Sequence, residues 1–285
     1  MRVLIGYNGS SASSAIFEDL TFAGLPPKSE IRILVVADPL VFPKTEAEAN
    51  DLAESAHREM CNRFPNYVFQ YRLDSGDAAG SVVREADAFH PDLIMLGEPG
   101  NPDADGHFKL GPVSQKVISD TTCSVRISRA PGVKEARPTR VLVGYDGSAG
   151  SKCAVESLLS RTWPDGLEVR FVSVADSAVV ATIGRFAPQI RDLAVSERYV
   201  QQWAETLCEG SRKRLIKADI ASDVAVRFGS PVTGILTEAV DWRADAILVG
   251  PHSAPTIGER STLGNVSLAV AAGADRSVEI CRCFT

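Results

Sequence analysis

The sequence predicts an α/β fold of two tandem domains, each with a doubly wound five-stranded parallel sheet. The 285 residues suit two domains, because a domain commonly holds about 100–200 residues. A long internal repeat divides the chain into two copies, and in each copy short apolar runs alternate with segments of helical periodicity. The composition is that of a globular protein, with 45% hydrophobic and 23% charged residues.

The repeat consists of matching segments at a nearly constant spacing. The pairs are Arg2–Ser10 with Arg140–Ser148, Glu30–Asp38 with Glu168–Asp176, and Pro91–Gly97 with Ala244–Gly250. The spacing is 138 residues for the first two pairs and 153 for the third, so copy two carries 15 extra residues between Asp176 and Gly229. A repeat of this length is a whole domain rather than one unit of a solenoid.

A connecting segment separates the two copies. Residues 130–138 contain two prolines and a glycine, which favour a loop over a helix or strand. We therefore expect domains at 1–130 and 139–285, joined by a linker at 131–138. A domain of about 140 residues buries roughly two thirds of its unfolded surface, so each copy can hold its own core.

The expected strands are short apolar runs, the pattern of strands buried on both faces of a parallel sheet. The first run of each copy ends at a glycine, Gly6 or Gly144. In copy one the expected strands are Val3–Ile5, Ile31–Val36, Tyr67–Arg72, Leu93–Leu96 and Ser124–Ile127. In copy two they are Val141–Val143, Val169–Val174, Ala221–Arg227, Ala246–Val249 and Ser277–Ile280.

Helices are expected between these strands. Ser10 and Ser148 are placed as N-caps of the first helices, after which apolar residues such as Ile16 and Leu20 recur at helical spacing. The later helices are expected at Thr45–Phe64, Ser81–Phe89 and Val113–Ile118 in copy one, and at Pro188–Ala218, Thr233–Trp242 and Val266–Ala272 in copy two. The long helix at Pro188–Ala218 absorbs much of the insertion.

Glycine-rich segments follow the fourth strand of each copy, at the edge of the sheet where parallel α/β folds bind ligands. Each segment has two parts separated by ten residues, Gly97–Gly100 with Gly111–Ser114 and Gly250–Ser253 with Gly264–Ser267. Glycines and the amides at a helix start suit an anion such as phosphate. Alone, such a motif more often marks a tight turn, but its recurrence at matching positions favours a binding site. It is neither a Walker motif nor a Rossmann fingerprint.

Taken together, these motifs resemble those of the universal stress protein family, and the resemblance covers nearly the whole chain. It implies a Rossmann-like fold of the adenine-nucleotide alpha-hydrolase type, with an adenine nucleotide bound as in the family's ATP-binding branch. Carried over, Asp146 and Val174 would contact the nucleoside of copy two. The phosphates would be held by Gly250, Ser253, Gly264, Asn265 and Ser267. In copy one the matching and weaker set is Asn8, Val36, Gly97, Gly100, Gly111, Pro112 and Ser114.

The two copies do not match the family pattern equally well. In copy one, Asn8 replaces the aspartate after strand one, and Pro112 removes a backbone donor after Gly111. Copy two keeps Asp146 and the N–H of Asn265, although Ser253 replaces the second glycine. Losing one charge-assisted hydrogen bond costs about 1.5–3 kcal/mol, or about tenfold or more in affinity. We therefore expect copy two to be the better nucleotide site and copy one to be weak or empty.

The six cysteines are expected to be reduced thiols, since they lie in apolar segments and none forms C-x-x-C. Cys281 and Cys283 are expected on one face of a terminal strand, with a metal or redox pair as the alternative. His252, inside the glycine-rich loop of copy two, either touches phosphate or is a solvated loop residue. No acid–base pair or Ser/His/Asp set is evident, so no catalytic residue is assigned.

The favoured function is a stress-related, ATP-binding signalling module, with hydrolysis at most slow and incidental and the role of Mg²⁺ left open. One alternative is an interaction scaffold that has lost nucleotide binding and works through protein partners. Another is an enzyme of the same superfold, such as an adenylyl transferase. The net charge of −6 argues against nucleic acid. No apolar run is long enough to span a membrane, so we expect a cytoplasmic protein.

The resemblance also predicts how the two copies sit together. Single-domain members of the family commonly pair as dimers, so we expect an intramolecular pseudo-dimer. Its shared interface would lie near the last strands, Ser124–Ile127 and Ser277–Ile280. Whether whole chains also form a homodimer stays open.

Overall fold

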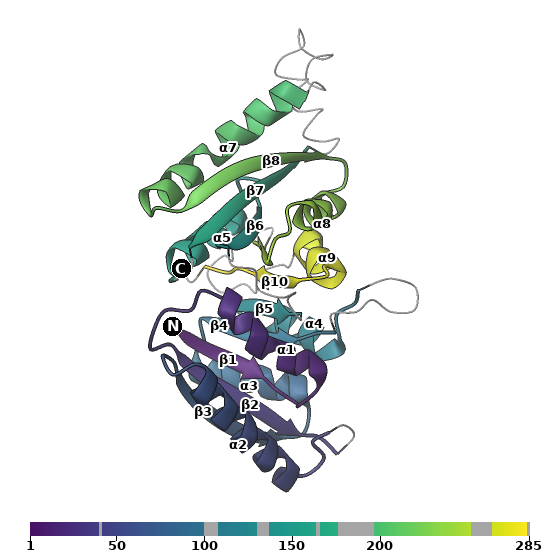
Figure 1. The fold of residues 1–285 in the computed structure, drawn as a ribbon. Coiled ribbons are helices and arrows are strands. Elements are labelled where there is room, and N and C mark those ends of the chain that lie inside the picture. The colour runs from purple at the N-terminus through teal and green to yellow at the C-terminus, as the bar shows by residue number, and fades with distance from the viewer. Residues whose placement is uncertain are drawn as a thin grey trace.

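The predicted α/β architecture is confirmed in the structure, which is a computed structural model (Figure 1). It describes residues 1–39, 42–99, 108–129, 137–163, 166–175, 197–251 and 264–283. The strands of copy one are β1 (Arg2–Gly6), β2 (Glu30–Ala37), β3 (Val68–Ser75), β4 (Leu93–Gly97) and β5 (Ser124–Ser128). Those of copy two are β6 (Thr139–Gly144), β7 (Leu167–Ala175), β8 (Ala221–Phe228), β9 (Ala246–Val249) and β10 (Ser277–Ile280).

The helices lie where the periodicity predicts them. Copy one contains α1 (Ser11–Asp19), the short 3₁₀ helix η1 (Leu20–Phe22), α2 (Glu46–Arg63), α3 (Ala78–Phe89) and α4 (Pro112–Asp120). Copy two contains α5 (Ala149–Leu159), α7 (Glu197–Lys217), α8 (Pro231–Asp241) and α9 (Asn265–Gly273). The first nine residues of the helix expected at Pro188–Ala218 lie outside the described residues.

The serine caps form as the sequence predicts. The Ser10 hydroxyl accepts the N–H of Ser13 at 3.2 Å, and the Ser148 hydroxyl accepts that of Ser151 at 3.1 Å. Each bond satisfies an amide that has no partner inside the first helical turn. Both first helices therefore start directly beyond the carboxyl end of a central strand.

The two sheets join into one. The strand order is β3-β2-β1-β4-β5-β10-β9-β6-β7-β8, and neighbours are parallel everywhere except at β5–β10, which is antiparallel. The sequence predicts two five-stranded sheets with their last strands near a shared interface. The structure confirms this and pairs those strands directly, so that a single ten-stranded sheet runs through both copies (Figure 1).

The helices cover the two faces of this sheet differently. On one face, α3 and α4 of copy one and α8 and α9 of copy two share a continuous apolar core. On the other face the cores are separate, with α1 and α2 over copy one and α5 and α7 over copy two. Apolar packing therefore links the copies on one face, and the junction on the other face is polar.

A buried ion-pair network occupies the polar junction. Arg126 of β5 faces Glu279 of β10 in the strand register, and the 153-residue spacing makes these two positions equivalent in the repeat. Arg126 binds both carboxylate oxygens of Asp19 at 2.7 Å and Glu279 at 3.4 Å, while Glu279 also pairs with Arg161. The side chains are at most 1% exposed. The four charges sum to zero, so the interior holds no excess charge.

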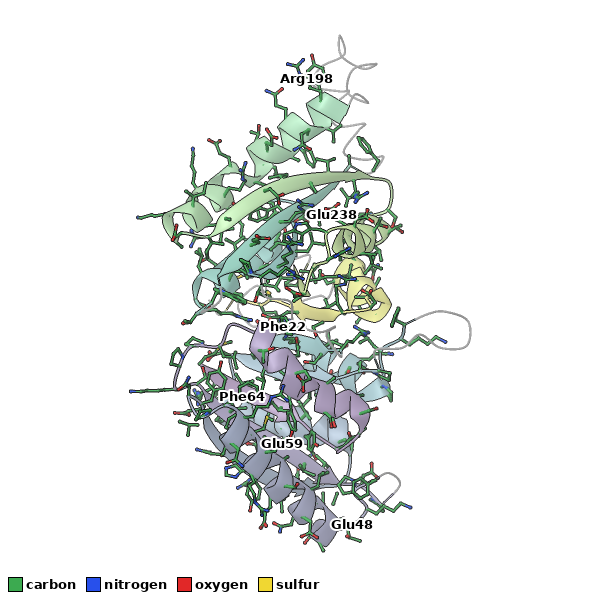
Figure 2. The ribbon with its side chains drawn as sticks, in the orientation of Figure 1. Phe22, Glu48, Glu59, Phe64, Arg198 and Glu238 are labelled. Atoms are coloured by element: carbon green, nitrogen blue, oxygen red, sulfur yellow. A yellow bond between two sulfur atoms is a disulfide. The ribbon has the colours of Figure 1, made fainter. Side chains whose placement is uncertain are left out.

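Two further arginines link the copies symmetrically. Arg129 donates to the carbonyl of Ala271 at 2.8 Å, and Arg282 donates to the carbonyl of Ile118 at 2.6 Å. At the 153-residue spacing Arg129 is equivalent to Arg282, and Ile118 is equivalent to Ala271. Each guanidinium thus reaches the last turns of the other copy's final helix, where carbonyls lack helical partners. Burial lowers the pKa of Arg129 to about 10. Figure 2 shows the side chains that fill the junction near Phe22.

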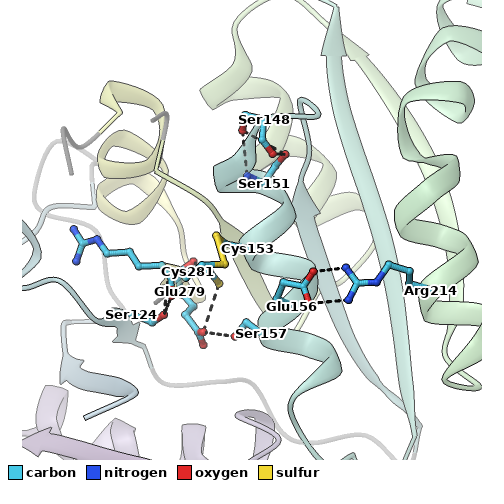
Figure 3. Close-up of a disulfide and its surroundings, with 11 residues drawn as sticks. Ser124, Ser148, Ser151, Cys153, Glu156, Ser157, Arg214, Glu279 and Cys281 are labelled. Carbon is cyan, nitrogen blue, oxygen red and sulfur yellow. Dashed lines mark hydrogen bonds and ion pairs between the residues drawn. A yellow bond between two sulfur atoms is a disulfide. The ribbon is translucent and has the colours of Figure 1, made fainter. Parts of the chain in front are cut away.

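The expectation of reduced thiols is wrong for two of the six cysteines. Cys153 of α5 and Cys283 form a disulfide with a Cα–Cα distance of 5.4 Å (Figure 3). Cys281 and Cys283 also lie beyond the end of β10 and not within it. The partners are 130 residues apart in sequence, so no local spacing signals the pair. The other four cysteines are free thiols.

Replacing Arg126 by alanine is expected to lower the free energy of unfolding by about 3–5 kcal/mol, because Asp19 and Glu279 would keep buried charges without it. Urea unfolding measures the change. Lys213→Ala is the control, since Lys213 and Glu209 form an exposed pair, and it should leave stability nearly unchanged. Equal effects of the two substitutions would contradict a structural role for the network.

The network also predicts acid sensitivity. Burial raises the pKa of Glu279, but the charges of Arg161 and Arg126 outweigh it and hold the pKa below its ordinary value of 4.5. The stability that this carboxylate contributes is present above pH 4.5 and is lost as the pH falls through the lower folded value. Glu279→Gln should flatten the fall in unfolding free energy between about pH 6 and pH 3. Parallel curves for the two proteins would show that Glu279 is not responsible.

Candidate ligand-binding site

Copy one contains a cavity of about 370 Å³ at the carboxyl ends of β1, β2 and β4, within the range of small-molecule sites. Its walls are mainly apolar. The apolar lining includes Leu34, Val36, Val82, Leu96 and Val113, and the polar lining includes Asn8, Ser10, Asp38, Glu98 and Ser114. The structure therefore brings together the predicted residues Asn8, Val36, Gly97, Gly111, Pro112 and Ser114. Gly100 lies outside the described residues.

The turn after the first strand has the same construction in both copies. Asn8 Oδ1 accepts the N–H of Ser10 at 3.2 Å, and Asp146 Oδ1 accepts the N–H of Ser148 at 3.0 Å. Asparagine and aspartate both build this turn, so Asn8 keeps the fold and removes only the charge. Burial raises the pKa of Asp146, but hydrogen bonds from Ser148 and Ser151 lower it overall, so the carboxylate is ionised at neutral pH.

The glycine that ends each fourth strand has a packing role. A Cβ atom on Gly97 would lie 2.0 Å from the carbonyl oxygen of Ala12, and one on Gly250 would lie 1.9 Å from the backbone of Gly150. Both distances are far below van der Waals contact. Gly97 and Gly250 thus allow the first helix of each copy to approach the strand end, whatever ligand binds there.

In copy one a carboxylate already occupies the start of α4. Glu98 Oε1 accepts the N–H of Gly111 at 2.9 Å, and Glu98 is only 6% exposed. Gly111 is the N-cap of α4 and Pro112 follows it without an N–H. Sequence reasoning missed Glu98, because the sequence shows an acidic residue inside the glycine-rich loop but not its hydrogen bond to Gly111.

In copy two the start of α9 is built differently. At the 153-residue spacing Pro251 replaces Glu98, so this position carries no carboxylate, and Asn265 replaces Pro112 and has an N–H. The Ser267 hydroxyl donates to the carbonyl of Gly250 at 2.5 Å, so Ser267 can offer an anion its amide but not its hydroxyl proton. Gly264 is the N-cap. The predicted contacts Ser253 and His252 lie outside the described residues.

The predicted nucleoside-contacting valines end the second strand of each copy. Val36 lines the cavity of copy one. Val174 is half-buried and packs toward α8, where a Cβ on Gly234 would lie 2.8 Å from its Cγ2. Among the residues that the structure describes, no group of three or more His, Cys, Asp and Glu side chains is arranged to bind a metal ion.

The chain belongs to the universal stress protein family, whose sequence model matches residues 1–129 and again 138–282. A universal stress protein from Archaeoglobus fulgidus has the same fold at 18% identity, with a TM-score of 0.63 over 99% of this chain and 96% of that one. A functionally unknown protein from Pseudomonas aeruginosa gives 15% identity and a TM-score of 0.65 over 99% and 92%. The comparison with curated protein sequences found no match. In the part of the chain described, the helices are too short or too polar to cross a bilayer.

Gly97→Ala is expected to lower the free energy of unfolding by about 3 kcal/mol or more, because the new methyl group overlaps the Ala12 carbonyl. Chemical denaturation measures this loss. Gly210→Ala in α7 is the matched control, since a Cβ there meets nothing within 4 Å, and it should raise stability by about 0.5–1 kcal/mol. The packing role is excluded if Gly97→Ala is as stable as the unmodified chain.

Proposed function

We propose that this protein binds an adenine nucleotide, ATP in the first instance, at the start of α9 in copy two. Membership of the universal stress protein family supports the proposal, and so does the resemblance of its motifs to the ATP-binding branch. The role is one of binding and signalling in a stress response, with any hydrolysis slow and incidental. A cytoplasmic location belongs to the same proposal.

The observation that carries the proposal is the difference between Glu98 and Pro251. A phosphate group needs unoccupied amide donors at the positive end of a helix. In copy one the Gly111 amide donates to the Glu98 carboxylate, whereas Pro251 cannot supply such an acceptor in copy two. The amides of Asn265, Val266 and Ser267, which begin α9, therefore suit a phosphate group.

The remaining contacts with the nucleotide would come from residues at the ends of the other strands of copy two. Val174 would pack against the adenine ring, and the Asp146 carboxylate would accept hydrogen bonds from the nucleoside. Gly250, Gly264 and Ser253 complete the proposed phosphate-binding segment. Mg²⁺ would enter through the phosphate oxygens of the nucleotide, as this ion commonly does in nucleotide sites.

The second candidate function is a scaffold that acts through protein partners. Copy one favours it, because Glu98 fills the helix start that would otherwise hold phosphate. The two functions are compatible if copy two binds the nucleotide and copy one contributes only a surface.

Asn265→Pro is expected to weaken ATP binding about tenfold or more, because it removes one amide donor from the start of α9. Proline is tolerated at a first helical position, so the fold should persist. Isothermal titration calorimetry with ATP and Mg²⁺ measures the affinity, and assay of released phosphate in the same samples measures turnover.

Pro112→Asn is the matched control, since it restores the equivalent donor in copy one, where Glu98 still occupies the helix start. It should leave ATP affinity unchanged. Equal affinity of Asn265→Pro and the unmodified chain would remove the proposed site, and rapid release of phosphate would remove the non-catalytic role.

A further inference from the structure

The cavity of copy one is a built site whose charge does not suit a nucleotide. About 370 Å³ of space lies between β1, β2, β4, α3 and α4, and most of its wall is apolar. A flat ring compound of nucleoside size fits such a volume, because small-molecule sites are largely apolar with a few directing polar groups.

The Glu98 carboxylate places a negative charge at the end of the cavity next to α4. Its side chain is 6% exposed and its Oε1 accepts the Gly111 amide at 2.9 Å, at the N-cap of α4. The start of α4 stabilises this carboxylate, just as it would stabilise a bound anion. An incoming phosphate would meet a like charge and would also lack the amide that Pro112 removes.

Two further charged residues, Asp38 and Arg129, lie in or near the cavity. Asp38 adds a second carboxylate to the lining. Arg129 is close enough for Glu98 to affect it electrostatically, but its Nη2 donates to the Ala271 carbonyl of copy two. Its Nε and Nη1 have no hydrogen-bond partner among the described residues, so it does not bind the Glu98 carboxylate directly.

The polar groups of the lining suit a neutral ligand. A carboxylate has about four acceptor positions, so Glu98 can accept a further hydrogen bond from a ligand hydroxyl or amino group. At the other end of the cavity Asn8 replaces aspartate, and its amide can donate, which a carboxylate cannot do. The cavity thus offers an acceptor at the helix and a donor at the turn.

We propose that the cavity of copy one binds an uncharged, nucleoside-sized heterocycle that carries no phosphate and donates a hydrogen bond to Glu98. This site is separate from the ATP site proposed in copy two and does not depend on it. Where copy two binds ATP as proposed, the two copies bind ligands that differ by the presence of phosphate.

The test compares nucleosides with their 5′-monophosphates on the full chain. Adenosine, guanosine, cytidine and uridine, each with its monophosphate, are titrated by calorimetry against the Val174→Trp variant, in which a bulky ring occupies the nucleoside position of copy two. At least one nucleoside should bind with a Kd below about 1 mM, and its monophosphate should bind at least about tenfold more weakly. Binding of none of the four nucleosides would overturn the proposal.

Three variants assign the effect to this cavity. Val36→Trp should abolish nucleoside binding, because the ring fills the space beside Val82. Glu98→Gln keeps an acceptor for the Gly111 amide and removes the charge, so the preference for nucleoside over monophosphate should fall at least about tenfold. Glu98→Pro introduces the residue that copy two has at this position and serves as a second variant of Glu98. Thermal unfolding confirms that each protein is folded.

The outcomes separate this proposal from the one for copy two. An unchanged preference in both folded Glu98 variants, or full nucleoside binding by Val36→Trp, would overturn the assignment to copy one. Loss of ATP binding in Asn265→Pro concerns copy two alone, so either proposal can fail while the other stands.

Discussion

The opposite charges of Arg126 and Glu279 constrain how the two halves of this protein join. The two residues occupy equivalent positions of the repeat and face each other across the antiparallel β5–β10 pair. In a symmetric pair of identical domains this position would face its own copy, and two like charges would meet in the interior. Opposite charges in the two copies remove that repulsion and favour the pairing of copy one with copy two. A buried ion pair adds little net stability, so its main effect is this choice of partner.

The antiparallel junction also separates the two proposed ligand sites. Strands β5 and β10 run in opposite directions, so the carboxyl ends of the two half-sheets point to opposite edges of the ten-stranded sheet. Ligands bind at the carboxyl ends of parallel strands. No side chain of one site therefore needs to suit the ligand of the other, and Glu98 and Pro251 could diverge without disturbing the shared core.

Features encoded locally could be predicted from the sequence. The strands follow from apolar runs, and the first helices follow from the Ser10 and Ser148 caps. The β5–β10 junction is a distant contact, and it could be predicted only through the resemblance to dimeric relatives. Distant contacts that no family resemblance implies could not be predicted. Cys153 and Cys283 meet only because α5 and the C-terminal segment pack together. An acidic residue in a glycine-rich loop is typical of a solvated turn, and only the folded chain shows Glu98 directed back onto Gly111.

In the glycine-rich motif, the glycine that ends the fourth strand and the residue after it therefore have different roles. Gly97 and Gly250 are required because a Cβ atom would overlap the neighbouring helix, and this requirement holds with or without a ligand. Their presence in both copies cannot distinguish a nucleotide site from a degenerate one. The next residue is Glu98 in copy one and Pro251 in copy two, and in the proposal its charge determines whether the following helix binds an anion. For a protein of this fold, the side chain that contacts the first amides of that helix is a better guide to ligand class than the glycines themselves.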